Sequence, residues 1–256
     1  MKRQLLWMVF FILLMTRLAA QTEDQTFHPM QFSGNISATN NGISLIPSFT
    51  LGKPATLITL SAGRRLSFDP EFRVGLNGKP WSLLFWWRYK LATGSKYRSH
   101  IGIHPALVFK SSDAVILGQA QEVLLVQRFL AGEWSQSYQL FKNMRIGLHG
   151  LYSRGLKESA THNTYFAAFH ANIGGIPLAQ HLRLQFIPQF YYLKMDARDG
   201  IYTSSTLVLS SDKLPVNLGS VLNWKIKSEV PGKDFVWNLS LNYPFHRRFM
   251  PTATTH

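Results

Sequence analysis

The sequence predicts an all-β protein, a single antiparallel up-and-down β-barrel that crosses a membrane, and three observations lead to this fold class. Apolar side chains recur with a period of two along most of the chain. The N-terminus has the form of an export signal. No run of eighteen apolar residues follows it, and the mean hydropathy is only −0.03. A barrel explains all three, because only every second residue of each strand faces lipid.

The clearest alternation covers residues 235–245, near the C-terminus. One face carries Phe235, Trp237, Leu239, Leu241, Tyr243 and Phe245, and the other carries Val236, Asn238, Ser240 and Asn242. Outer-membrane barrels tend to end on an aromatic-rich strand with a terminal Phe, which the barrel-assembly machinery recognises. We therefore expect Phe245 to end the barrel and that machinery to be a partner, with 246–256 as a short polar tail.

The first twenty residues predict a cleaved signal peptide. Lys2 and Arg3 precede an unbroken apolar run from Leu5 to Met15, and Leu18-Ala19-Ala20 offers small residues for cleavage. As a helix, this run would rise only about 16 Å, against a bilayer core of about 30 Å. The barrel is then expected to occupy 21–245.

Turn sequences divide this region into about twelve strands, with ten to fourteen possible. The region from Gln119 to Leu140 can form one long strand or a hairpin at Ala131-Gly132-Glu133. No connecting segment is expected to be long enough to plug the lumen. The turn signals are Thr39-Asn40-Asn41-Gly42, Gly52-Lys53-Pro54, Ala62-Gly63-Arg64, Asn77-Gly78-Lys79-Pro80, Ala92-Thr93-Gly94-Ser95, Ala197-Arg198-Asp199-Gly200 and Pro231-Gly232-Lys233-Asp234.

A soluble sandwich or lipocalin-like barrel would also alternate, but with its apolar face turned inward. Aromatic side chains near strand ends favour the membrane barrel, as do charged side chains at mid-strand, which would be costly in a packed core. The expected interface belt consists of Trp81, Trp87, Tyr89, Tyr192, Trp224, Trp237 and Tyr243.

The polar faces of the strands predict a mixed but mainly basic lumen wall, which would favour small anions. The alternative is that these charges pair across strands and fill the barrel as a polar plug. The candidate lumen or ligand residues are Arg65, Asp69, Glu71, Arg73, Arg88, Lys90, Arg98, His100, His104, Arg145, His149, Arg183, Lys225 and Lys227.

The charge balance argues against other classes of partner. Of 27 basic side chains three lie in residues 1–20, and with 13 acidic ones the remainder carries a formal charge of +11. An export signal and the scattered positions of the charges argue against nucleic acid, and favour outer-membrane lipid or lipopolysaccharide. The chain contains no cysteine, so disulfides and thiol chemistry are excluded.

Catalysis and metal binding are weakly supported, and we predict no catalytic residue, metal or cofactor. The His and Ser candidates for a lipid-modifying enzyme are His100, His104, His149 and His170 with Ser67, Ser82, Ser99 and Ser153, but no G-x-S-x-G motif occurs. On a strand, His100 and His104 would lie about 13 Å apart, too far to chelate one ion.

Several segments resemble a group of uncharacterised outer-membrane β-barrel proteins of Bacteroidetes-type bacteria. They are 40–47, 51–54, 78–81, 85–90 and 189–196, and the resemblance extends over most of the mature chain. It implies a location in the Gram-negative outer membrane and transfers no site residue. The predicted function is a porin-like channel or binding barrel for small anionic solutes. A non-conducting docking barrel for envelope partners is the alternative, and a lipid-modifying enzyme is less favoured.

Overall fold

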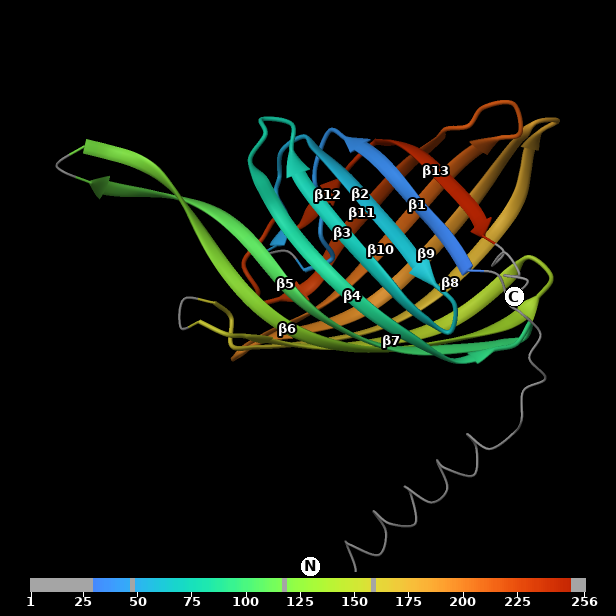
Figure 1. The fold of residues 1–256 in the computed structure, drawn as a ribbon, viewed down its shortest axis with the longest axis horizontal. Helices are drawn as coiled ribbons and strands as arrows, with labels where there is room; N and C mark the ends of the chain where they lie inside the picture. Colours follow the sequence, from blue (N-terminus) through green and yellow to red (C-terminus); the bar gives the residue numbers. More distant parts are fainter. Residues whose placement is uncertain (1–29, 47–48, 117–118, 158–159, 250–256) are drawn as a thin grey trace, which may run out of the picture. The chain divides into compact units, whose positions relative to one another are not determined.

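A computed structural model describes residues 30–46, 49–116, 119–157 and 160–249, which form a β-barrel (Figure 1). Within these ranges no helix is long and apolar enough to cross a bilayer. The strands are β1 (Met30–Thr39), β2 (Ala55–Gly63), β3 (Leu66–Gly75), β4 (Pro80–Thr93), β5 (Tyr97–Ile116), β6 (Gln119–Phe141), β7 (Met144–Gly155), β8 (Asn163–Ala179), β9 (Leu182–Met195), β10 (Arg198–Ser211), β11 (Asn217–Ser228), β12 (Phe235–Trp237) and β13 (Ser240–Phe249).

Each strand pairs antiparallel with its neighbours, and the sheet closes on itself. β1 pairs with both β2 and β13, and β11 connects β13 to β10. β12 and β13 pair with β11 in one continuous register, from Trp224↔Phe235 to Asn217↔Asn242. They are therefore one interrupted strand, and the barrel has the twelve strands that the sequence predicts.

Residues 119–140 form one long strand, and the alternative hairpin at Ala131-Gly132-Glu133 is absent. β5 pairs with β6 along its whole length, from Tyr97↔Tyr138 to Ile116↔Gln119. Beyond Val108 on β5 and Phe129 on β6, the two strands pair only with each other. These residues, 109–116 and 119–128, form a projecting ribbon that extends away from the barrel (Figure 1).

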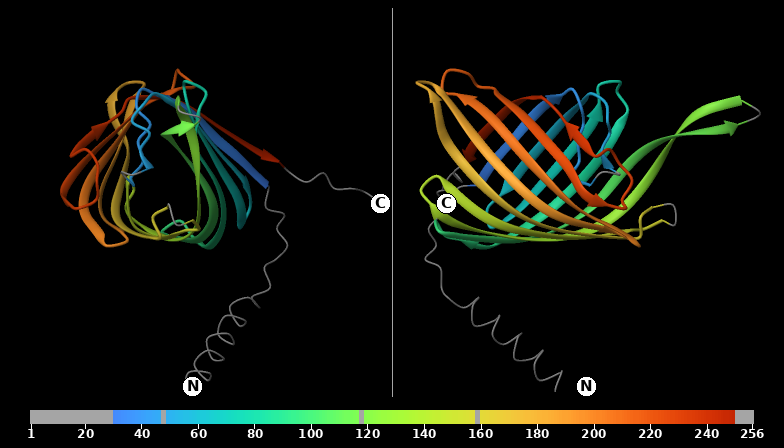
Figure 2. Two further views of the ribbon diagram at one scale, coloured as in Figure 1. Left: turned by 90° about the vertical axis from the view of Figure 1, so that its left-hand side faces the viewer. Right: turned by 180° about the vertical axis from the view of Figure 1, so that it is seen from behind.

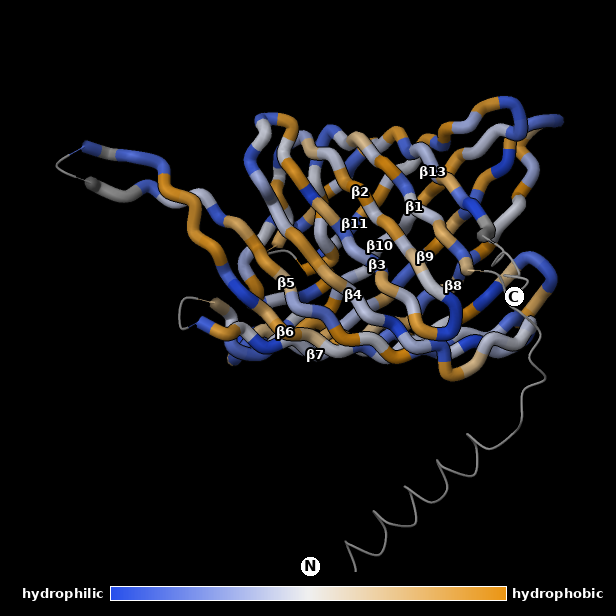
Figure 3. The backbone as a smooth tube through the Cα atoms, in the orientation of Figure 1, coloured by the Kyte–Doolittle hydropathy of each residue, from blue (hydrophilic) through white to orange (hydrophobic). Residues whose placement is uncertain are grey.

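The two faces of the strands point as predicted for a membrane barrel, and polar and apolar positions alternate along the chain (Figure 3). On β4 the exposed Trp87 and Tyr89 alternate with the buried Trp86 and half-buried Arg88. Of the expected belt, Trp87, Tyr89, Tyr192, Trp224, Trp237 and Tyr243 are 37–51 % exposed. Side chains buried inside include Ser67, Asp69, His104, Glu133, Ser204 and Asn223.

Trp81 is the exception, and its placement in the outer belt is wrong. The register between β3 and β4 shifts after Arg73, which pairs with Ser82, so that Val74 pairs with Pro80 and Trp81 is skipped. Such a bulge changes the face on which a side chain lies. Trp81 is only 2 % exposed, and its indole N–H donates a 2.7 Å hydrogen bond to the carbonyl of Phe49 inside the barrel.

The two ends of the barrel differ in the length of their connections. At the turn end, connections 64–65, 94–96, 142–143, 180–181 and 212–216 have at most five residues, and Met30 and Phe249 pair there. The loop end has two short connections, 76–79 and 196–197, but it also carries the longer segments 40–54, 156–162 and 229–234 and the projecting ribbon. Because outer-membrane barrels have short periplasmic turns and longer extracellular loops, we assign the loop end to the cell exterior.

The last strand is longer than expected. β13 continues four residues beyond Phe245, and Phe249 pairs with Met30 at its end. The predicted barrel boundary at 245 therefore shifts to 249. The predicted signal peptide, 1–20, and residues 250–256 of the predicted tail lie outside the described residues, so signal cleavage stays a prediction.

Candidate functional site

The described residues of the segment between β1 and β2, 40–46 and 49–54, fold into the barrel, and we call this segment the lumenal segment. Leu45 and Ile46 pack against an interior cluster that contains Phe166, Tyr191 and Tyr202. Figure 2 shows it inside the ring of strands in the view along the barrel. The expectation that no connecting segment could plug the lumen is therefore wrong.

Hydrogen bonds close this segment at its neck. The Gly42 N–H donates to the Lys53 carbonyl at 2.8 Å, and the Leu51 N–H donates to the Gly42 carbonyl at 2.9 Å. A Cβ at Gly42 would lie 2.9 Å from the Trp81 ring, so a larger residue would not fit. Further in, the Ser44 N–H donates to the Thr50 hydroxyl at 3.0 Å, and that hydroxyl donates to the Ser44 carbonyl at 3.1 Å.

The Trp81 indole tests how firmly the lumenal segment is held. Trp81→Phe keeps an aromatic ring but removes the hydrogen bond to Phe49, so we expect a loss of about 1 kcal/mol in unfolding free energy. It should also raise protease or hydrogen-exchange accessibility within 43–51. Trp86→Phe, which leaves the Phe49 hydrogen bond intact, is the control. Equal accessibility in both variants would contradict the assigned anchoring role.

Arg88, on β4, is the centre of a charged network on the lumen wall. Its Nε donates to Glu133 Oε1 at 2.6 Å, and its Nη1 donates to Asp69 Oδ2 at 3.1 Å. The Glu133 side chain, on β6, is 2 % exposed and also faces His100 Nε2 at 3.3 Å and His149 Nε2 at 3.7 Å. Both carboxylates of this network thus have partners, and removing one partner would leave a buried charge uncompensated.

A second ion pair lies beside this network, and the arginines of both networks each lie against an indole ring. Arg73 Nη2 lies 2.6 Å from Glu71 Oε2, and its guanidinium lies 5.2 Å from the Trp81 ring centre. The Arg88 guanidinium lies 4.4 Å from the Trp86 ring centre, and that ring also contacts His104. These cation–π contacts fix the orientation of both arginines.

The predicted lumen residues are therefore divided between the centre and the two ends. The central group contains Asp69, Glu71, Arg73, Arg88, His100, His104 and His149. Glu133 joins them and is not among the predicted site residues, because the sequence left open a hairpin at Ala131-Gly132-Glu133. The strict period of two on a long β6 would have placed it inward.

The remaining candidates lie near the barrel ends. At the turn end, Arg65 donates to the Lys90 carbonyl, Lys90 to the Arg64 carbonyl, and Arg145 to the Ser95 carbonyl. Exposed Arg98 lies near the start of β5, and Arg183 lies 3.8 Å from Asp212. At the loop end, Lys225 pairs with Asp234.

The sequence predicts that Lys225 and Lys227 share the lumenal face of their strand. In the structure they lie on opposite faces. The register between β10 and β11 shifts between Ile201 and Tyr202, so Lys225 pairs with the buried Tyr202 and Lys227 with the exposed Ile201. The bulge turns Lys227 to the outer surface. The single continuous basic wall is therefore wrong: at the centre Arg73 and Arg88 pair with three carboxylates, and most of the other predicted cations lie toward the two ends of the barrel.

A cavity of about 380 Å³ separates the lumenal segment from the wall. One side is apolar, with Phe49 of the segment against Ala106, Val108 and Phe129 of the wall. The other side carries three buried polar atoms that have no hydrogen-bond partner among the described residues: Arg73 Nε, Ser82 Oγ and His104 Nδ1. Ser82 is 4 % exposed and His104 5 % exposed. Buried polar atoms without partners are costly, so these atoms favour a bound ligand or water.

A second cavity, of about 390 Å³, lies at the loop end beside the projecting ribbon. Lys53, Lys79 and Lys110 line it together with one acidic residue, Glu122. Lys79 hydrogen-bonds to Glu122, and this bond lowers the pKa of the Glu122 carboxyl. We call this second cavity the extracellular mouth. Its three ammonium groups and one carboxylate give it a net positive charge.

A closed twelve-stranded barrel with an apolar exterior defines the protein as an outer-membrane β-barrel. No family model and no curated protein matches the chain. Solved structures that are similar include OmpT, an outer membrane protein of Vibrio cholerae (9% identity, 88% of this chain and 100% of that one, TM-score 0.42).

Two further solved structures are similar to the chain. One is the β domain of the Bordetella autotransporter BrkA (10% identity, 85% and 99% covered, TM-score 0.43). The other is an outer membrane channel from Pseudomonas putida F1 (11% identity, 90% and 98% covered, TM-score 0.44). The resemblance to Bacteroidetes-type barrels stays a prediction, as does the partnership with the barrel-assembly machinery.

Proposed function

We propose that the protein is an outer-membrane channel or binding barrel for small organic anions with an apolar body, closed in this conformation by the lumenal segment. The observation that carries the proposal is the 380 Å³ cavity, which combines an apolar side with the unpartnered atoms of Arg73, Ser82 and His104. Its volume and its few converging polar groups are typical of small-molecule sites.

The net positive charge at the extracellular mouth supports an anionic solute. Lys53, Lys79 and Lys110 surround the entrance, and a charged cleft raises the local concentration of counter-ions. Inside, the Arg73 N–H and the Ser82 hydroxyl can donate to a carboxylate, while the ring of Phe129 packs against an apolar body. The interior ion pairs of Arg88 hold the wall in place and need not take part in binding.

Reversal potentials in a KCl gradient test the charge preference. The chain is first opened by replacing residues 43–51 with a short Gly-Ser linker. In planar bilayers we expect this opened chain to be anion-selective, and its reversal potential to shift toward cations by several millivolts when Lys53→Gln/Lys79→Gln/Lys110→Gln is added. The control is the same triple exchange to Arg, which keeps the charge and should keep the selectivity. Cation selectivity in the opened chain, or an unchanged potential in its Gln variant, would contradict the proposal.

A docking barrel is the second candidate, and the projecting ribbon favours it. Leu124 and Leu125 lie on opposite faces of this ribbon and are 42 % and 49 % exposed. Deletion of residues 110–125 should abolish a docking function but leave conductance in place. A lipid-modifying activity has less support, because His100 and His149 lie inside the barrel beside the buried Glu133, away from the lipid on which such an enzyme would act.

A further inference from the structure

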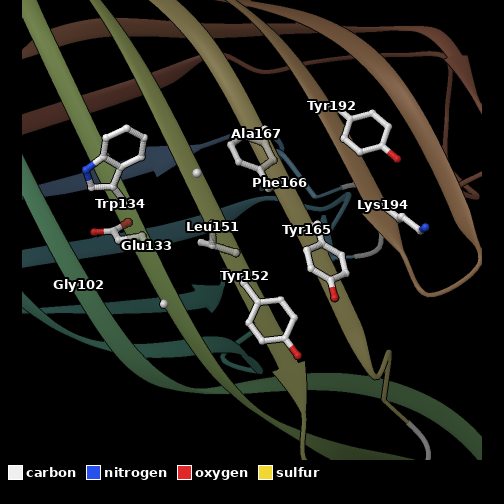
Figure 4. A pocket seen from close by; sticks show the side chains of 12 residues that line it. Gly102, Glu133, Trp134, Leu151, Tyr152, Tyr165, Phe166, Ala167, Tyr192 and Lys194 are labelled. Carbon is white, nitrogen blue, oxygen red and sulfur yellow. The ribbon is translucent and has the colours of Figure 1, made fainter. Parts of the chain in front are cut away.

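The outer surface of β6, β7 and β8 contains a shallow groove whose floor has almost no side chains. Gly132, Gly150 and Ala167 form the floor, and the register brings them together: Gly132 pairs with Tyr152, and Gly150 with both Trp134 and Ala167. The rim consists of Trp134, Tyr152, Tyr165 and Tyr192, which are 37–48 % exposed (Figure 4). The groove faces lipid, because the alternate residues Glu133 and Phe166 are buried inside.

Packing within the barrel does not require glycine on this floor. A Cβ at Gly132 would come no nearer than 3.8 Å to the Gly102 carbonyl, and one at Gly150 would come no nearer than 4.0 Å to the Trp134 carbonyl. Neither residue has a positive φ. Lipid-facing positions of a barrel usually carry larger apolar side chains. Two adjacent strands therefore leave a hollow that a hydrocarbon chain can fill.

Three cations follow the groove toward the loop end. Arg128, Arg154 and Lys194 each alternate with a side chain buried inside, respectively Phe129, Ser153 and Leu193, so all three point outward. Each side chain is exposed, and none of the three side chains makes a hydrogen bond or ion pair with the described residues. Asp199, paired in register with Lys194, is the acidic neighbour, and its carboxylate accepts a hydrogen bond from the Tyr192 hydroxyl.

The tyrosine hydroxyls beside the groove indicate where these cations lie relative to the membrane interface. Tyr152 donates to Asn163 at 2.8 Å and Tyr192 to Asp199 at 2.9 Å, so both rings end in polar surroundings next to the groove. Tyrosine at this level is typical of the membrane interface. With the loop end outside the cell, the cations lie at the headgroups of the outer leaflet, where phosphate is the complementary charge.

We propose that this surface is a binding site for a phosphorylated, multiply acylated glycolipid of the outer leaflet, the chemistry of lipopolysaccharide. One acyl chain lies over Gly132 and Gly150 between Trp134 and the tyrosine rings. The headgroup phosphates contact Arg154 and Lys194, and Arg128 extends the cationic surface along β6. The site is on the outside of the barrel, so it is independent of any solute in the lumen.

Retention of glycolipid by the full chain tests the site. Native mass spectrometry after mild detergent extraction should show bound glycolipid on the native protein. In Arg128→Gln/Arg154→Gln/Lys194→Gln its affinity, measured by titration of purified lipopolysaccharide, should fall at least roughly tenfold. The matched control is Lys142→Gln/Lys213→Gln/Lys233→Gln, which removes three exposed charges elsewhere and should leave affinity unchanged.

A groove-filling variant separates the acyl contact from the charge. Gly132→Leu/Gly150→Leu should weaken glycolipid binding while folded mobility on unheated gels stays native. Equal affinity in the native chain and in both variants would overturn the site. Equal affinity of the native chain for phosphatidylglycerol and for lipopolysaccharide would overturn the assignment of the occupant.

Discussion

Replacing residues 43–51 with a short Gly-Ser linker is expected to open the lumen. Conductance in planar bilayers should rise by about tenfold or more, because twelve strands enclose a lumen between the side-chain-filled eight-stranded barrels and the open porins. The lumenal segment supplies Leu45, Ile46 and Phe49 to the interior clusters. Removing these side chains leaves the ion pairs of Arg88 on the wall and a continuous path beside them.

The control for this deletion replaces 212–216, a connection at the turn end, with the same linker. It should fold and keep the native conductance, since that connection contributes no residue to the lumenal cavity. Unchanged conductance after removal of 43–51 would contradict the role of the lumenal segment as the closure. Migration as a folded barrel on unheated gels shows that either variant has assembled.

The second large effect is a loss of stability expected on substitution of Glu133. Glu133→Ala leaves the Arg88 guanidinium with Asp69 alone and removes the carboxylate that His100 and His149 face. Breaking one partner of a buried ion pair is costly, so the unfolding free energy should fall by about 3 kcal/mol. Urea titration of the barrel in lipid vesicles measures it.

A double-mutant cycle separates the ion pair from packing. Arg88→Met/Glu133→Leu replaces both charges with apolar groups. Its loss of unfolding free energy should be smaller than the sum of the losses in Arg88→Met and Glu133→Leu. If Glu133→Ala lowers the unfolding free energy by less than about 0.5 kcal/mol, as a surface substitution does, the charged network contributes little to stability.

The sequence predicts the barrel well because its strand rule is local. Alternation over 235–245 defined the last strand, and the aromatic residues Trp87 and Trp237 lie outside, as expected for a lipid-facing row. Trp81 and Lys227 were misplaced because each adjoins a bulge, where one extra residue reverses the face of those that follow. A bulge depends on the pairing of two strands and leaves no signal in the period of either.

The lumenal segment was missed for a different reason. Its apolar residues, Ile43, Leu45, Ile46 and Phe49, are too many for an exposed connection, and this is the signal that could have identified it. Alternation describes strands alone and says nothing of a loop that packs inside them. The central charges were predicted individually, but their pairing depends on register across β3 to β7, which places Glu133 among them.

Single-tryptophan proteins in vesicles of brominated lipid test most directly which rows face hydrocarbon. After residues 1–20, the chain has six tryptophans: 81, 86, 87, 134, 224 and 237. Bromine should quench Trp87, Trp134, Trp224 and Trp237 when each is retained alone with the others changed to Phe. The fluorescence of Trp81 and Trp86 should remain unquenched. Strong quenching of Trp86 with none of Trp87 would mean that the apolar rows point inward, which contradicts a membrane barrel.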